Sequence, residues 1–175
     1  MTSTIPEKIA ALRARLLNPD RPGGAVLVVY PPEEELAFRA EYNLVLHELA
    51  AKHLPVEVLD LRLLVFEALE AKGLLGKTFQ MDAVGSRELR PNLAGMVQRE
   101  TQQRVLTTAE GHPDAILCCK NSAALFPWIS FSALLEQLEN QLAAPLVIPF
   151  PGTENGATLH FLNAKDGYNY RAARI

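Results

Sequence analysis

The chain has 175 residues, 49% of them hydrophobic and 21% charged, so it can bury a core and is too apolar for a disordered protein. Its formal net charge of −3 excludes a global electrostatic attraction for nucleic acid or anionic lipid. No segment has the roughly 20 apolar residues of a membrane-spanning helix, and the N-terminal residues lack a signal-peptide pattern, so we expect a cytoplasmic protein.

The predicted elements alternate between helices and strands. Apolar residues at helical spacing predict a first helix at 6–17, which ends at the turn-forming run NPDRPGG. The continuous apolar run at 25–30 predicts a strand that is buried on both faces. Two prolines end this strand, and a long helix should then run to about His53. The later elements are a strand at 56–61, a helix that ends near Gly73 or Gly76, a helix at 92–108, a strand at 114–119, a helix at 131–142 and a strand at 145–150.

Two regions are less regular. Residues 77–113 show the weakest periodicity, and Pro91 should interrupt them. Pro149 suggests that the strand at 145–150 lies toward a sheet edge or ends early. The tail reads as two further strands, TLHFL and YNYRAARI, joined by a turn at Asp166-Gly167.

This alternation implies right-handed crossovers and a three-layer α/β fold, a mainly parallel sheet flanked by helices. We expect a P-loop-like topology without a Walker A motif, and an antiparallel C-terminal hairpin that extends the sheet. There is no internal repeat or linker, so residues 1–175 should form one domain.

Functional residues in such a sheet usually lie beyond the carboxyl ends of the strands. The run PPEEE follows the first strand there, and its prolines lack amide donors while its glutamates would repel phosphate, so the sequence argues against a conventional phosphate-binding loop. Glu33, Glu34 and Asp60 follow strand ends and offer carboxylates for a divalent metal or a nucleotide-bound metal. The alternative is structural, because acidic residues favour helix starts and Asp60 can cap a helix.

A second weak signal is the set of arginines at Arg87, Arg90, Arg99 and Arg104, which suggests a basic face for nucleic acid. Interspersed glutamates dilute the positive charge, and no aromatic stacking platform accompanies it. A solvated helix face is the favoured explanation of these arginines.

Other reactive residue types point to no reaction. The four histidines have no metal-ligand spacing, and no G-x-S-x-G elbow is present. Cys118 and Cys119 are neighbours in an apolar strand, so their side chains should point to opposite faces and be buried. We expect no catalytic residue, no cofactor and no bound metal.

Two aromatic clusters follow the third and fourth predicted strands of this alternation, at the same edge of a parallel sheet. Exposed aromatic and proline residues in such loops are typical of protein recognition. The alternative is that these aromatic side chains pack over helix ends as local core. The residues of this predicted partner-binding edge are Phe126, Pro127, Trp128, Phe150, Pro151 and Gly152.

The order of these motifs resembles the BrxB-like family, the B component of BREX (bacteriophage exclusion) systems and a domain of unknown function. One matching segment has the pattern LFP followed by S-LL and LE, and the other is the closing PLV-FPG, DG and YYRA pattern. The matching residues are Leu125 to Pro127, Ser132, Leu134, Leu135, Leu138 and Glu139, then Pro145 to Val147, Phe150 to Gly152, Leu162, Asp166 to Tyr168, Tyr170 to Ala172 and Ile175. The chain departs from the family at Lys120–Ser122, where a glycine-containing turn is common, and at Ser130, where an arginine is common.

The resemblance implies a role in phage defence and association with the PglZ-like, alkaline-phosphatase-superfamily protein and other BREX components. No enzymatic activity is carried over by it. We therefore expect a non-catalytic interaction or scaffold subunit. A degenerate nucleotide- or metal-binding enzyme and a nucleic-acid-binding accessory protein stay open as alternatives.

Overall fold

The computed structural model describes residues 3–163 and 172–175, without the side chain of Arg90. Within these residues one sheet holds five parallel strands in the order β2-β3-β4-β1-β6, and β5 pairs antiparallel with β4. The strands are β1 (Gly24–Tyr30), β2 (Val56–Asp60), β3 (Ile116–Lys120), β4 (Pro145–Asn155), β5 (Thr158–Phe161) and β6 (Ala173–Arg174). The helices are α1 (Ile5–Leu17), α2 (Glu35–Ala51), α3 (Leu64–Ala71), α4 (Leu75–Ala83), α5 (Leu89–Gly111) and α6 (Phe131–Leu138), with short 3-10 helices η1 (Pro32–Glu34) and η2 (Ser122–Leu125).

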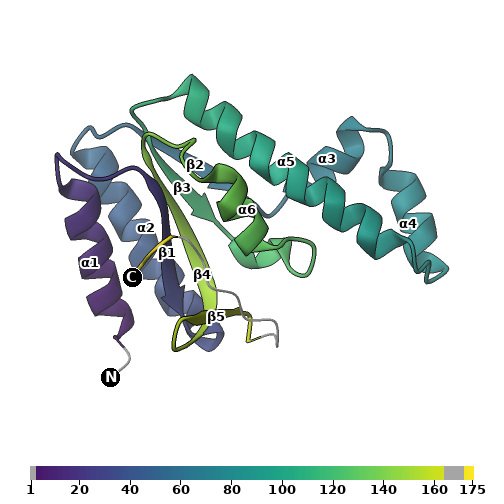
Figure 1. Ribbon diagram of the computed structural model, residues 1–175, viewed down its shortest axis with the longest axis horizontal. Coiled ribbons are helices and arrows are strands. Elements are labelled where there is room, and N and C mark those ends of the chain that lie inside the picture. The colour runs from purple at the N-terminus through teal and green to yellow at the C-terminus, as the bar shows by residue number, and fades with distance from the viewer. Residues whose placement is uncertain (1–2, 164–171) are drawn as a thin grey trace.

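Helices cover both faces of the sheet, which gives three layers (Figure 1). α1 and α2 share one apolar cluster with the sheet, and α3, α5 and α6 share the other. β1 serves both layers, because Val26 and Val28 pack toward α1 and α2 while Leu27 and Val29 pack toward the opposite face. The predicted three-layer, mainly parallel α/β fold and its buried first strand are confirmed.

The segment between β2 and β3 is more helical than its periodicity suggests. The helix predicted at 92–108 is α5, which begins at Leu89 and ends at Gly111. Pro91 does not interrupt it, because it lies in the first turn, where a backbone N–H has no intrahelical acceptor. α4 has no counterpart among the predicted elements. None of the described helices combines the length and apolar character needed to cross a membrane.

Pro149 lies inside the sheet, so its expected place at an edge is wrong. β4 pairs with β1 from Gly24↔Pro145 to Tyr30↔Pro151, whereas its pairing with β3 covers only Leu117↔Leu146 and Cys118↔Val147. The Pro149 carbonyl accepts a hydrogen bond from the Ser122 hydroxyl at 2.5 Å, so this residue faces the β3 side beyond the last pair. Proline has no backbone N–H to donate, and this is tolerated at position 149 because β3 no longer pairs with β4 there.

The predicted C-terminal hairpin is corrected where the chain is described. Its first arm is β5, which pairs antiparallel with β4 from Gly152↔Phe161 to Asn155↔Thr158. The end of its second arm is β6, which lies parallel to β1 with Val26↔Ala173 and Leu27↔Arg174 in register. The predicted turn at Asp166-Gly167 and residues 168–171 lie outside the described residues.

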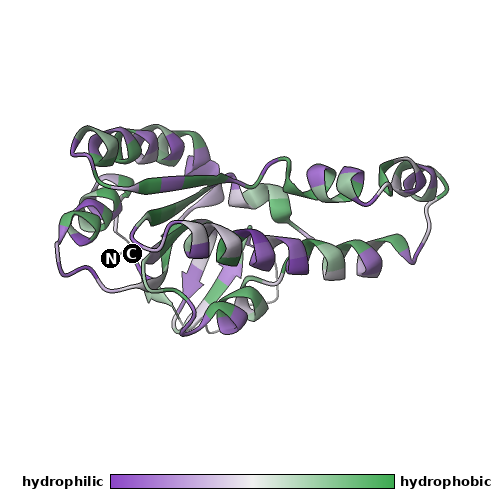
Figure 2. Ribbon diagram, turned by 90° about the horizontal axis from the view of Figure 1, so that it is seen from above, coloured by the Kyte–Doolittle hydropathy of each residue, from purple (hydrophilic) through white to green (hydrophobic). Residues whose placement is uncertain are grey.

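The part of the chain that extends farthest beyond the sheet consists of α3, α4 and residues 89–99 of α5. We call this part the helical arm. Figures 1 and 2 show that the arm extends past the sheet on the side of β2 and β3. Gly73 and Gly85 stand at its two turns with φ of 64° and 65°. This left-handed conformation ends α3 and then α4, and glycine adopts it without steric cost.

Candidate partner-binding surface

The helical arm is packed on one side only. Each residue of α4 is exposed or half-buried, and none is buried. Phe79 is 56% exposed in α4, and Val84, directly after it, is 80% exposed. Phe66 of α3 is also about half exposed. Large apolar side chains that no element of the chain covers are typical of interaction surfaces when they cluster.

Two of these side chains, Phe66 and Phe79, line a common cleft of about 280 Å³ between α3, α4 and the loop after β3. Phe66 and Phe79 line it from the arm, and Ala124 and Trp128 line it from the loop. A second hollow, bordered by Asp82, Gly85 to Arg87, Leu89 and Trp128, also contains part of the same arm. Trp128 is thus shared by both hollows. We call Phe66, Phe79, Phe126 and Trp128 the aromatic rim.

The loop that contributes Phe126 and Trp128 is held by its own backbone. The Trp128 N–H donates to the Leu125 carbonyl at 2.8 Å, and Leu125 is fully buried beneath it. Phe126 remains 43% exposed, with its ring centre 6.2 Å from that of Phe161. Pro127 is exposed and Trp128 is half-buried. The first predicted aromatic cluster therefore lies at the surface, beside the arm.

The second predicted aromatic cluster is not at the surface, which corrects the expectation for Phe150, Pro151 and Gly152. All three are buried, and Phe150 has an exposed fraction of 0%. The ring centre of Phe150 lies 5.0 Å from that of Phe161, because β5 pairs antiparallel with the end of β4. A Cβ atom on Gly152 would come within 2.2 Å of the His160 carbonyl oxygen, so the two strands leave no room for a side chain at this position.

The acidic residues after the first strand do not gather into a metal site. Glu33 and Glu34 are exposed in η1, and among the described residues no group of three histidines, cysteines, aspartates or glutamates is placed to hold a metal ion. The third carboxylate of the run, Glu35, accepts a hydrogen bond from the Tyr30 hydroxyl at 2.5 Å and forms an ion pair with Arg39 at 2.7 Å. That arrangement neutralises one carboxylate locally.

Asp60 is already engaged by its neighbours. Its carboxylate forms an ion pair with Arg62 at 2.6 Å and accepts a hydrogen bond from the Asn121 amide at 2.9 Å. The hydrogen bonds from Arg62, and then that from Asn121, lower the pKa of Asp60 to about 2. The nearby cavity between Tyr30, Arg39 and Lys120 has a volume of about 10 Å³. That is room for about one water molecule, so this cavity cannot hold a nucleotide.

The three described arginines do not share one face. Arg99 and Arg104 are five residues apart on α5, which places them about 140° apart around the helix axis. Arg104 is paired with Glu67 of α3 at 3.1 Å, and Arg87 lies in the loop before α5. The side chain of Arg90 is outside the described part of the chain. A continuous basic face is therefore not formed by the three described arginines.

The two cysteines lie where the sequence predicts them. Both are buried in β3, with Cys118 in the cluster beneath α1 and α2 and Cys119 in the opposite cluster. Burial raises the pKa of Cys118 to about 12 and raises that of Cys119 still further. Neither thiol is therefore poised to act as a thiolate.

The aromatic side chains on the arm, Phe66 and Phe79, are absent from the predicted site. A signal for them exists in the run GLLGKTFQMDAVG, where Gly73 and Gly85 enclose a segment with Leu75 and Phe79 at i, i+4 spacing. That spacing predicts a short helix with one apolar face. Nothing in the spacing tells that the face lacks a covering element.

Comparisons with known proteins complete the description of this surface. Searches of curated proteins and of solved structures found no match. The family described as BREX protein BrxB matches residues 57–175, which is more than half of the chain. The matched part begins in β2 and includes the helical arm, the loop after β3 and the remaining strands. The chain therefore belongs to the BrxB family of BREX proteins.

Proposed function

We propose that the chain is a non-catalytic interaction subunit of a BREX phage-defence system. In this proposal it docks the larger PglZ-like protein, a member of the alkaline phosphatase superfamily, through the aromatic rim. The single observation that carries the proposal is the cleft of about 280 Å³ that three of the rim side chains line, beside a helix without any buried residue.

The composition of the rim supports a protein partner. Phenylalanine and tryptophan supply much of the binding energy at protein interfaces, because they bury a large area and lose few rotatable bonds. Phe79 and Trp128 face a common cleft, which offers a pocket for an anchoring side chain of the partner. The rim residues all fall within the matched range 57–175.

The buried cluster gives the rim a rigid support. The ring of Phe161 lies between the two predicted loops, 6.2 Å from Phe126 and 5.0 Å from Phe150. In this proposal the partner contacts only the first loop. The buried residues Phe150, Pro151 and Gly152 support that loop by holding Phe161, and through it Phe126, in place. A preorganised loop lowers the entropy that docking costs.

Co-purification with the PglZ-like protein of the same BREX system tests the proposal. A Phe79→Ala, Trp128→Ala double variant should lower recovery of the partner by about tenfold or more, the loss expected when anchoring residues are truncated. The matched control is a Leu36→Ala, Leu44→Ala double variant on the outer side of α2. Both leucines are exposed, and Leu44 is 56% exposed, as Phe79 is. This control should recover the partner like the wild type.

Thermal unfolding of each variant by circular dichroism shows whether the fold is intact before recovery is compared. Equal recovery by the wild type and the Phe79→Ala, Trp128→Ala variant would reject the aromatic rim. Failure of the wild type to recover the PglZ-like protein would reject the partner itself.

A further inference from the structure

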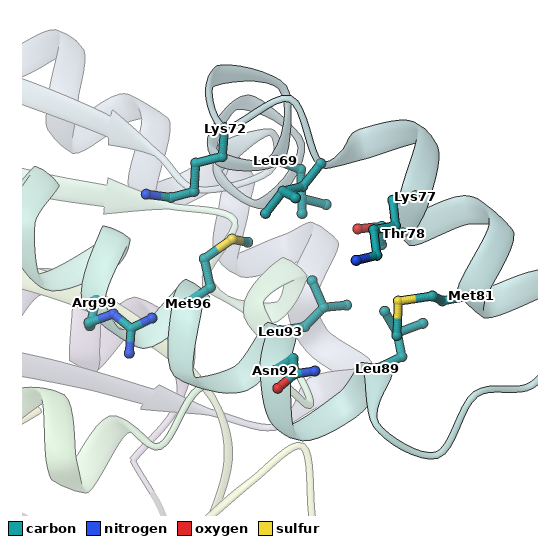
Figure 3. Close-up of a pocket in the computed structure, with 11 residues that line it drawn as sticks. Leu69, Lys72, Lys77, Thr78, Met81, Leu89, Asn92, Leu93, Met96 and Arg99 are labelled. Atoms are coloured by element: carbon teal, nitrogen blue, oxygen red, sulfur yellow. The ribbon is translucent and has the colours of Figure 1, made fainter.

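A second cavity on the helical arm has a different character from the aromatic rim. It has a volume of about 350 Å³ and lies between α3, α4 and α5 (Figure 3). That volume is within the range of small-molecule sites, roughly 300–1,000 Å³. The cavity adjoins the rim's cleft, because Leu69, Thr78, Leu89 and Leu93 line both. On α4, Lys77 and Met81 line only the cavity, whereas Phe79 and Asp82 line only the cleft.

The floor of the cavity is apolar. On α5, Leu89, Leu93 and Met96 recur at helical spacing and so share one face of the helix. Leu69 of α3 and Met81 of α4 face them in Figure 3. The two methionines are flexible and polarizable, so the floor can adapt to the shape of a ligand.

The edge of this cavity, which is distinct from the aromatic rim, is cationic. Among the described residues that line it, three are basic, Lys72, Lys77 and Arg99, and none is acidic. Lys72 is paired with Glu100 at 2.8 Å, whereas within the described residues neither Lys77 nor Arg99 has an ion-pair partner. The guanidinium of Arg99 lies at this edge, 3.7 Å from the position of a Cβ atom on Gly95. The net positive charge of the cavity lining is opposite in sign to the chain's net charge of −3.

We propose that this cavity binds a small anionic amphiphile, a molecule with an apolar body and a carboxylate or phosphate head. The apolar body occupies the floor of leucines and methionines, and the head lies at the end of the cavity where Arg99 supplies a planar fork for a carboxylate or phosphate. Lys77 lies at the other end of the floor (Figure 3), so its point charge attracts the anion from farther away. This site goes beyond the proposed docking function, because its cationic groups lie outside the aromatic rim and its ligand is of a different class.

Methionine methyl NMR gives a direct test, because the chain has three methionines, and Met81 and Met96 both line the cavity. Decanoate and decyl phosphate serve as probes, and decanol is the neutral probe of the same chain length. Titration with either anion should shift the Met81 and Met96 signals and leave that of Met1, which precedes α1, unchanged. Decanol should bind about tenfold more weakly, since it lacks the charge-assisted hydrogen bonds.

Two variants locate the head group. Lys77→Gln with Arg99→Gln should weaken binding of decanoate by about tenfold or more. The matched control, Lys8→Gln with Lys52→Gln, removes one half-buried and one exposed cation elsewhere and should bind like the wild type.

Equal affinity for decanol and decanoate would overturn the anionic preference, and equal affinity of the Lys77→Gln, Arg99→Gln variant would overturn the site. Absence of any shift with both anions at millimolar concentration would overturn the proposal as a whole. Shifts caused by an acidic amphipathic peptide, but by neither anion, would replace the small molecule with a protein segment. Because Phe79 and Trp128 are untouched here, failure of this proposal leaves the docking test unaffected.

Discussion

Two similar dipeptides, Phe126-Pro127 and Phe150-Pro151, have opposite environments. Phe150 belongs to β4, between β3 and β1, and its side chain points toward α6, where Phe131 and Phe161 surround it. Phe126 follows η2 in a loop, where only one side of its ring is covered. The local sequence is alike, and the difference comes from which segments far along the chain pack on each ring.

This difference predicts unequal costs for the same truncation. Phe150→Ala should lower the free energy of unfolding by about 3–5 kcal/mol, because it leaves a cavity in a closed core. Phe126→Ala should cost about 1 kcal/mol or less, because the exposed ring loses little beyond its contact with Phe161. Urea unfolding of the two variants measures both values. A cost for Phe126→Ala as large as that of Phe150→Ala would show that the loop belongs to the core.

Helices of this chain differ in how they are held. α2 buries Phe38, Tyr42, Val45 and Leu49 along one face, and Arg13 of α1 pairs with Glu48 at 2.7 Å. α4 has helical backbone hydrogen bonds and a glycine, Gly85, just beyond its C-terminal end, but no buried side chain. In proteins most helix stability comes from packing of an apolar face, so α4 is the weakly anchored helix of this pair.

Amide hydrogen exchange should therefore separate these two helices. Amides in the middle of α4 should exchange at least about tenfold faster than those in the middle of α2, because α4 can open without disrupting the core. Mass spectrometry of peptides covering 75–83 and 38–49 gives the comparison. Equal protection would mean that the arm unfolds only with the rest of the molecule.

In the molecule as a whole, the sheet is shielded by two layers of helices, and β3 lies inside it between β2 and β4. Cys118 and Cys119 point from β3 into the two separate clusters. Each apolar cluster therefore contains one cysteine, whose accessibility reports whether that cluster has opened. The helical arm extends from this core, so opening of α4 exposes neither thiol.

Thiol labelling should consequently report global unfolding. Burial holds the pKa of both cysteines above the ordinary value of 9.0, to about 12 for Cys118, so at pH 8 the native thiols stay neutral and covered. Iodoacetamide should modify neither in the native protein and both in urea, as counted by intact mass. Rapid native labelling of one cysteine would show that the corresponding helical layer opens alone.

Continuous apolar runs predicted the buried strands β1, β3 and β4 because burial on both faces leaves a signal in neighbouring residues. Helical spacing likewise predicted α1, α2 and α6 within a few residues. The BrxB assignment also follows from linear motifs, chiefly in the C-terminal third. These features depend on residues close together in the chain.

Local sequence patterns did not predict the strand order, the parallel pairing of β6 with β1 or the burial of Phe150. The contact between Asp60 and Asn121 joins residues 61 positions apart, which no local spacing records. The same holds for the two hollows of the helical arm, because α3, α4 and α5 line both and the segment after β3 also lines the cleft. Whether an apolar face is covered or left open depends on which distant segments pack against it, so the aromatic rim and the cationic cavity are properties of the folded chain.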